Sequence, residues 1–187
     1  MSDKPLVAAF DLATSTGVCL GVVGEQPRVT TWDLRTAGPS RSRRLLHFSN
    51  MCDELFRRHD VIHVRYEAPL SVPVLSKIGT NEGTVTFLRS LVGILEACAA
   101  RADIKDIQEF NVQDARQYLT GQRTFRKNRS GLGKNEAKER VMKMARALGV
   151  QCHTYDEADA VAGWYLCCGQ LNPRLSITTT PLFAETA

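Results

Sequence analysis

The chain has 187 residues, of which 43% are hydrophobic and 24% charged, a composition that excludes a collagen and a fully disordered chain. No repeat period is present, so a solenoid is excluded as well. The most apolar run, residues 91–100, contains Glu96 and is well short of the roughly 20 residues that a helix needs to cross a bilayer. We therefore expect one domain without a membrane segment, and the first residues, which lack the pattern of an export signal, predict a cytoplasmic protein.

The first third of the chain predicts an antiparallel meander followed by a helix and a fourth strand. Short apolar runs predict strands over 6–10, 18–23 and 28–34, with a turn at Thr14–Gly17. Apolar residues at helical spacing predict a helix over 45–59, and the run 61–67 predicts the fourth strand. Pro69 and Pro73 then force the chain into a loop.

The rest of the chain predicts mainly helices around a fifth strand. Helices are expected over 81–100, 112–119, 136–148 and 156–168, a strand over 104–110, and a flexible basic loop over 121–133. The order of elements predicts an α/β domain over residues 1–170, with a mixed five-stranded sheet and helices on both faces. Residues 171–187 show no period and predict a loosely attached tail.

Several conspicuous residues are better explained by the core than by chemistry. The six cysteines lie within or beside apolar runs and form no Cys-x-x-Cys pair, which favours reduced core thiols over zinc ligands. Trp32 and Trp164 have apolar neighbours and are expected to pack in the core rather than to stack on bases. The pattern assigns no role to His47, His59 or His63.

Positive charge is concentrated in one stretch of the chain. Residues 116–146 hold ten Lys or Arg against two Glu, a net charge of +8, whereas the whole chain carries +4 and the remainder therefore −4. A field of this kind is expected on a surface that meets polyphosphate, although a solvated helix face would give the same pattern. A smaller basic set flanks the helix predicted at 45–59: Arg41, Arg43, Arg44, Arg57 and Arg58.

Four acidic residues form the most specific chemical pattern. Asp11 and Glu67 each follow a strand that should be central, where an ionised carboxylate is costly unless it is paired, hydrogen-bonded or bound to a metal. Asp156 and Asp159 lie three residues apart and so share one face of a helix, although Asp156 could instead be a helix N-cap and Asp159 a surface residue. No basic residue lies close to them in the local sequence. Such a cluster is what two-metal phosphodiester hydrolysis requires.

Four segments resemble, in the same order, the motifs of the RuvC-type Holliday junction resolvases of the ribonuclease H-like superfamily. They are Phe10–Val18, Val64–Glu67, Gly133–Val141 and Asp156–Ala162, and the resemblance covers roughly residues 5–170. It implies a ribonuclease H-like fold and a homodimer that nicks paired strands of a four-way DNA junction in recombination and repair. Two Mg²⁺ ions, with Mn²⁺ as a substitute, would be held by the catalytic residues Asp11, Glu67, Asp156 and Asp159.

The DNA-binding residues come from three parts of the chain. The resemblance implies phosphate contacts from Lys134 and Lys138, and from Thr14 and Ser15 in the first turn. The basic loop adds four candidate contacts: Arg123, Arg126, Lys127 and Arg129. The resemblance also implies the homodimer, for which the apolar helix at 81–100 is the candidate interface.

Two other functions stay open. A branched-DNA binding protein that keeps this fold without cutting is one, and the loss of any of the four acids would favour it. The turn Asp11–Gly17 also resembles the phosphate loop of sugar kinases and actin-like ATPases. Those proteins need two such domains and a glycine-rich adenosine site, which this sequence lacks. The leading hypothesis is a Mg²⁺-dependent endonuclease.

Overall fold

Five strands form one mixed sheet in the computed structural model, which describes residues 4–68, 82–122 and 133–175. Their order across the sheet is β3-β2-β1-β4-β5. The first three strands pair antiparallel, whereas β4 pairs parallel with β1 on one side and with β5 on the other. The strands are β1 (Leu6–Asp11), β2 (Ser15–Val22), β3 (Arg28–Asp33), β4 (Val61–Glu67) and β5 (Asp106–Phe110).

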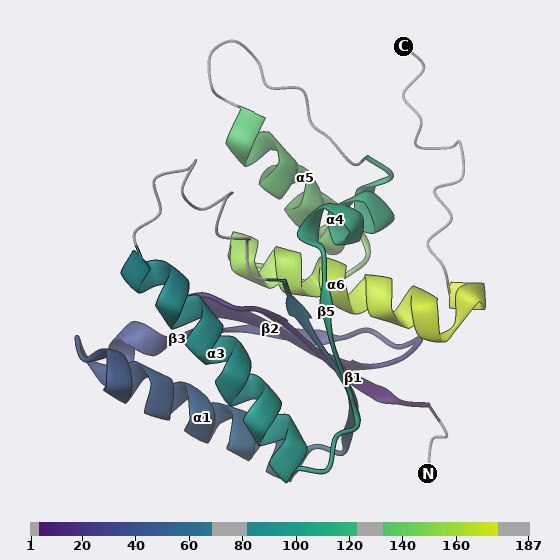
Figure 1. The fold of residues 1–187 in the computed structure, drawn as a ribbon. Helices are drawn as coiled ribbons and strands as arrows, with labels where there is room; N and C mark the ends of the chain where they lie inside the picture. The colour runs from purple at the N-terminus through teal and green to yellow at the C-terminus, as the bar shows by residue number, and fades with distance from the viewer. Residues whose placement is uncertain (1–3, 69–81, 123–132, 176–187) are drawn as a thin grey trace.

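Helices cover both faces of this sheet, as the sequence predicts (Figure 1). One face is covered by α1 (Arg41–Arg58) and α3 (Glu82–Arg101). The other is covered by α4 (Val112–Thr120), α5 (Gly133–Ala147) and α6 (Tyr155–Leu171). Two short 3-10 helices, Leu34–Ala37 and Pro173–Leu175, complete the described part of the chain.

Two apolar layers sandwich the sheet, and β1 contributes to both. Ala8 and Phe10 pack towards α1 and α3, whereas Val7 and Ala9 pack towards α6. A strand buried on both faces reads as a continuous apolar run, which explains why the sequence identifies β1 so clearly. All six cysteines and both tryptophans are buried, as predicted.

Element boundaries differ from the prediction where polar residues belong to regular structure. The strand β2 begins at Ser15 rather than at residue 18, because the turn closes earlier, where the buried Thr16 hydroxyl donates to the Ala13 carbonyl at 2.7 Å. The helix α1 begins at Arg41 rather than at residue 45, since its first turn is exposed and shows no apolar period. The helix α6 runs on to Leu171; residues 176–187 lie outside the described residues, so the loose tail stays a prediction.

Among the described residues, α3 alone is long and apolar enough to cross a membrane, judged by length and composition. Its most apolar window has a mean hydropathy of 1.3, and 28% of that window is buried. Leu91, Leu95 and Cys98 are buried in the core shared with α1. A helix that packs on a sheet passes the same test, so the absence of a membrane segment stays a prediction.

Candidate active site

The pairing of β1 with β4 brings Asp11 and Glu67 together. The two strands are parallel neighbours with Phe10 opposite Tyr66, so the residue that follows each one lies at the same edge of the sheet. The charge of Glu67 helps to raise the pKa of Asp11, as expected for neighbouring carboxyl groups. Two of the four predicted acids therefore form a pair at the carboxyl ends of central strands.

The first turns of α6 supply the other two acids. The helix begins at Tyr155 with Thr154 as its N-cap, so the alternative in which Asp156 caps the helix is wrong. Asp159 lies almost one turn further on and is buried, which also excludes a surface position for it. The helix packs against both β1 and β4 and so places its acids at the edge where Asp11 and Glu67 lie.

The electrostatics of Asp11 show that the four acids converge. Burial raises the pKa of Asp11 to about 9, with further contributions from the charge and hydrogen bond of Glu67 and from the charges of Asp159 and Asp156. The pKa of Glu67 is also raised, chiefly by burial, while the hydrogen bond from Asp11 opposes the rise. Burial and mutual repulsion therefore disfavour a negative charge on both carboxyl groups at once.

A basic residue enters this cluster from a distant part of the sequence. Arg116 on α4 donates from Nε to Oδ1 of Asp159 at 2.8 Å and from its terminal nitrogen to Oδ2 at 2.6 Å. Both side chains are largely buried, with exposed fractions of 12% and 4%. The local sequence around the four acids does not reveal this pairing, because Arg116 lies 43 residues before Asp159. Ala115 and Leu119 are buried on α4, and this apolar spacing is the sequence signal that turns the helix towards α6.

The donor set fits a hard divalent cation, but the present arrangement of the side chains does not complete a site. Carboxylates such as these four, whose charges act together at Asp11, are the oxygen ligands that Mg²⁺ and Mn²⁺ prefer. Within residues 4–68, 82–122 and 133–175, however, no group of three or more His, Cys, Asp or Glu side chains is arranged to hold a metal ion. Arg116 already engages both oxygens of Asp159.

Only some of the predicted DNA-binding residues can be placed. Lys138 on α5 lies over the Tyr155 ring, with its Nζ 5.7 Å from the ring centroid, and its charge acts on Glu67. Thr14 and Ser15 lie in the turn that follows Asp11 and at the start of β2, and Lys134 lies in the first turn of α5. The loop residues lie outside the described residues: Arg123, Arg126, Lys127 and Arg129.

A buried carboxylate anchors the turn that carries Asp156. One oxygen of Glu157 accepts a hydrogen bond from the Thr31 hydroxyl on β3 at 2.9 Å, and the other accepts one from the backbone N–H of His153 at 2.6 Å. Together with Thr154 it completes a capping box. Sequence reasoning missed this role, although Thr-x-x-Glu before an apolar run is its signature.

A close backbone contact makes Gly17 a sensitive position. A Cβ at Gly17 would lie 2.0 Å from the carbonyl oxygen of Asp156, so a side chain there must displace the first turn of α6. We expect Gly17→Ala to cost about 1–3 kcal/mol in the free energy of unfolding, measured with a chemical denaturant. Because the displaced turn carries Asp156, any activity that depends on the four acids should fall as well.

The matched control is Gly93→Ala on α3, where a Cβ meets nothing within 4 Å. That variant should be as stable as the wild type or more so, since alanine favours a helix over glycine by about 1 kcal/mol. Wild-type stability of Gly17→Ala would show that the close approach of Asp156 to β2 does not matter.

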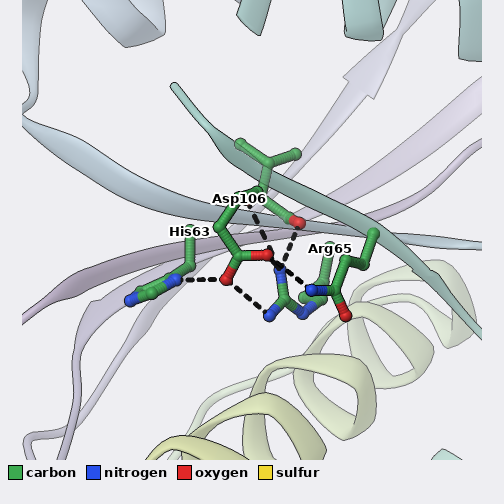
Figure 2. Close-up of polar contacts among 5 residues, drawn as sticks. His63, Arg65 and Asp106 are labelled. Atoms are coloured by element: carbon green, nitrogen blue, oxygen red, sulfur yellow. Dashed lines mark hydrogen bonds and ion pairs between the residues drawn. The ribbon is translucent and has the colours of Figure 1, made fainter. Parts of the chain in front are cut away.

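A second buried ionic cluster lies on the same face of β4, two residues before Glu67 (Figure 2). Arg65 is 5% exposed and donates to both carboxylate oxygens of Asp106 on β5, at 3.1 and 2.8 Å. His63 Nδ1 lies 2.5 Å from Oδ2 of the same carboxylate. None of the four predicted catalytic acids takes part. We therefore interpret the cluster as one that stabilises the pairing of β4 with the edge strand β5.

Breaking this cluster should destabilise the fold in a pH-dependent way. Hydrogen bonds from Arg65 lower the pKa of Asp106 from its ordinary 3.8, with a smaller contribution from His63. A lowered pKa contributes stability above the ordinary value, and that stability is lost as the pH falls through the folded-state pKa. We expect Asp106→Asn to lose about 2–3 kcal/mol at pH 7, because it leaves the Arg65 charge buried without an opposite charge beside it.

Denaturant titrations at several pH values test this expectation. The stability gap between the wild type and Asp106→Asn should narrow as the pH falls from 5 towards 3. A stability difference that is independent of pH would show that Asp106 stabilises the fold by its shape rather than by its charge.

No protein-family model matches the chain, and no curated protein matches it in sequence. Solved structures do match its fold. Thermus thermophilus RuvC aligns at 17% identity with a TM-score of 0.63, covering 91% of this chain and 96% of that one. T. thermophilus RuvC in complex with a Holliday junction substrate aligns at 15% identity and a TM-score of 0.58, covering 90% and 96%. The yeast mitochondrial Holliday junction resolvase Ydc2 aligns at 14% identity with a TM-score of 0.54, covering 90% of this chain and 80% of that one. The chain thus has the fold of the RuvC-type resolvases, which the motif order predicts.

Proposed function

We propose that the protein is a metal-dependent endonuclease that resolves four-way DNA junctions. The observation that carries the proposal is the convergence of Asp11, Glu67, Asp156 and Asp159 at the carboxyl ends of two central parallel strands. The fold is shared with resolvases, one of which is in complex with a Holliday junction substrate. The basic stretch 116–146, in which the charge of Lys138 acts on Glu67, supplies charge that suits a DNA backbone.

Some residues of the site would bind the metal, and others position the residues that bind it. Asp11, Glu67, Asp156 and Asp159 would hold Mg²⁺, which when bound activates water and stabilises the leaving oxygen of a phosphodiester. Glu157 and Gly17 fix the turn that carries Asp156.

A cleavage assay tests the proposal. The pure protein is incubated with end-labelled four-way, flap and linear duplex DNA, with Mg²⁺ or with a chelator, and the cuts are mapped. We expect paired nicks in the four-way junction when Mg²⁺ is present and none when the chelator is present. Junction binding without cuts under any condition would instead support the non-cleaving DNA-binding protein, which the engagement of Asp159 by Arg116 favours. Equal cutting of linear duplex would contradict junction specificity.

We also propose that the active form is a homodimer that pairs through α3, because two symmetric nicks need two active sites. Gly93 and Ala97 are exposed on this helix. Gly93 is exposed and a Cβ there meets nothing within 4 Å in the protomer, so Gly93→Arg should leave the fold intact. The same change should separate the dimer, because it places a charge in the interface.

Analytical ultracentrifugation with and without junction DNA measures the effect. Asn50→Arg, at an exposed position on α1, is the control and should leave the dimer intact. A wild-type protein mass near the 20.7 kDa of one chain, with junction bound, would contradict the dimer.

A further inference from the structure

The position of Arg116 has a consequence for metal binding. Its guanidinium makes two hydrogen bonds to Asp159, one to each oxygen, and lies close enough to Glu67 and Asp11 for their charges to act on it. A cation in this position does what a metal ion would do, since it offsets the charge of acids that would otherwise be buried without a partner.

We propose that Arg116 is the internal counter-ion of the carboxylate cluster, and that a divalent ion binds by displacing its guanidinium from Asp159. The inference rests on the proposed metal-dependent function and adds a control of metal loading to it.

Two observations support an exchange rather than simultaneous binding. The ion pair is largely buried, and like charges a few ångströms apart repel strongly where water is excluded. The described residues also contain no group of three donors arranged for a metal, although four acids converge. Asp159 is the most deeply buried carboxylate of α6. Its release from Arg116 would free it to bind a metal ion.

The other charged groups around Asp159 do not replace this role. Lys138 acts on Glu67 but lies over the Tyr155 ring. Arg65, the other buried arginine on this side of the sheet, is held by Asp106 in the separate cluster between β4 and β5 (Figure 2). Arg65 is therefore a matched control: it is a largely buried arginine with a bidentate carboxylate partner, and that partner is not one of the four predicted metal ligands.

Calorimetric titration with Mn²⁺ tests the proposal on wild type, Arg116→Lys, Arg116→Gln and the control Arg65→Lys. We expect Arg116→Gln to bind Mn²⁺ about 10-fold tighter than the wild type or more, because the competing cation is gone. Arg116→Lys should be intermediate, since lysine keeps the charge but lacks the bidentate fork. Arg65→Lys should bind as the wild type does. Unchanged or weaker binding by folded Arg116→Gln would overturn the proposal.

A second measurement on the wild type covers the case in which Arg116→Gln does not fold. The Nε–H signal of Arg116 in a ¹⁵N NMR spectrum, assigned by its loss in Arg116→Lys, should shift and lose protection from exchange as Mg²⁺ is added. A signal that stays protected at saturating Mg²⁺ would overturn the exchange while leaving the nuclease intact. A wild-type protein that neither binds Mn²⁺ nor cuts a junction would overturn the proposed function itself.

Discussion

Asp11→Asn is expected to lose junction cleavage by about three orders of magnitude or more, while it binds the junction as tightly as the wild type or more tightly. Asparagine keeps the shape of the side chain but removes a negative ligand at the centre of the cluster, where Glu67, Asp156 and Asp159 all act on the same carboxyl group. Asparagine also cannot ionise, so it adds no repulsion of the phosphate backbone at this position. Binding and cleavage should therefore separate in one variant.

The measurement is a single-turnover nicking assay with Mg²⁺, beside fluorescence anisotropy on the same junction. Asp60→Asn, an exposed acid outside the cluster, should cut and bind like the wild type. Cleavage by Asp11→Asn at a rate near that of the wild type would remove the basis for a metal site at these four residues. Loss of binding together with cleavage would show that Asp11 serves the fold instead.

The second large effect is expected from the basic loop. Replacing Arg123, Arg126, Lys127 and Arg129 together by alanine should weaken junction affinity and flatten its salt dependence. Each phosphate neutralised on duplex DNA contributes about −0.9 to the slope of log K against log salt, so four lost contacts would change the slope by about 3 to 4. Stability should hardly change, because the segment contains few apolar residues.

Anisotropy across a salt series decides between this loop and the other basic set. The matched variant replaces four exposed arginines of α1 by alanine and should keep the wild-type slope; they are Arg41, Arg43, Arg57 and Arg58. An unaltered slope in the loop variant with a flattened slope in the α1 variant would place the DNA along α1.

The sequence predicts the sheet and most of its helices because burial leaves clear apolar patterns. The run that forms β1 is buried on both faces, and the acids Asp11 and Glu67 stand out because they end such runs. The pairing of β1 with β4 then brings them together. Polar segments carry no such pattern, and the prediction fails there: Ser15–Gly17 belongs to a strand and Arg41–Arg44 to a helix.

The partners of the site residues are less predictable than the residues themselves. Arg116 stands at the start of a strongly basic stretch, where each positive charge suggests contact with DNA rather than with Asp159, 43 residues further on. The packing of α4 on α6 decides this pairing, and it depends on contacts across the whole layer. His63 likewise has no motif, and only the register of β4 with β5 places it opposite Asp106.

The most direct test of the central claim is a crystal soaked with Mn²⁺ and measured at a wavelength where manganese scatters anomalously. The account predicts anomalous peaks bounded by Asp11, Glu67 and the acids of α6, with the Arg116 guanidinium moved away from Asp159. The account would be contradicted if this cluster showed no anomalous peak at millimolar Mn²⁺ and Arg116 were still paired to Asp159. Such a result would exclude a metal-dependent nuclease built on these four carboxylates.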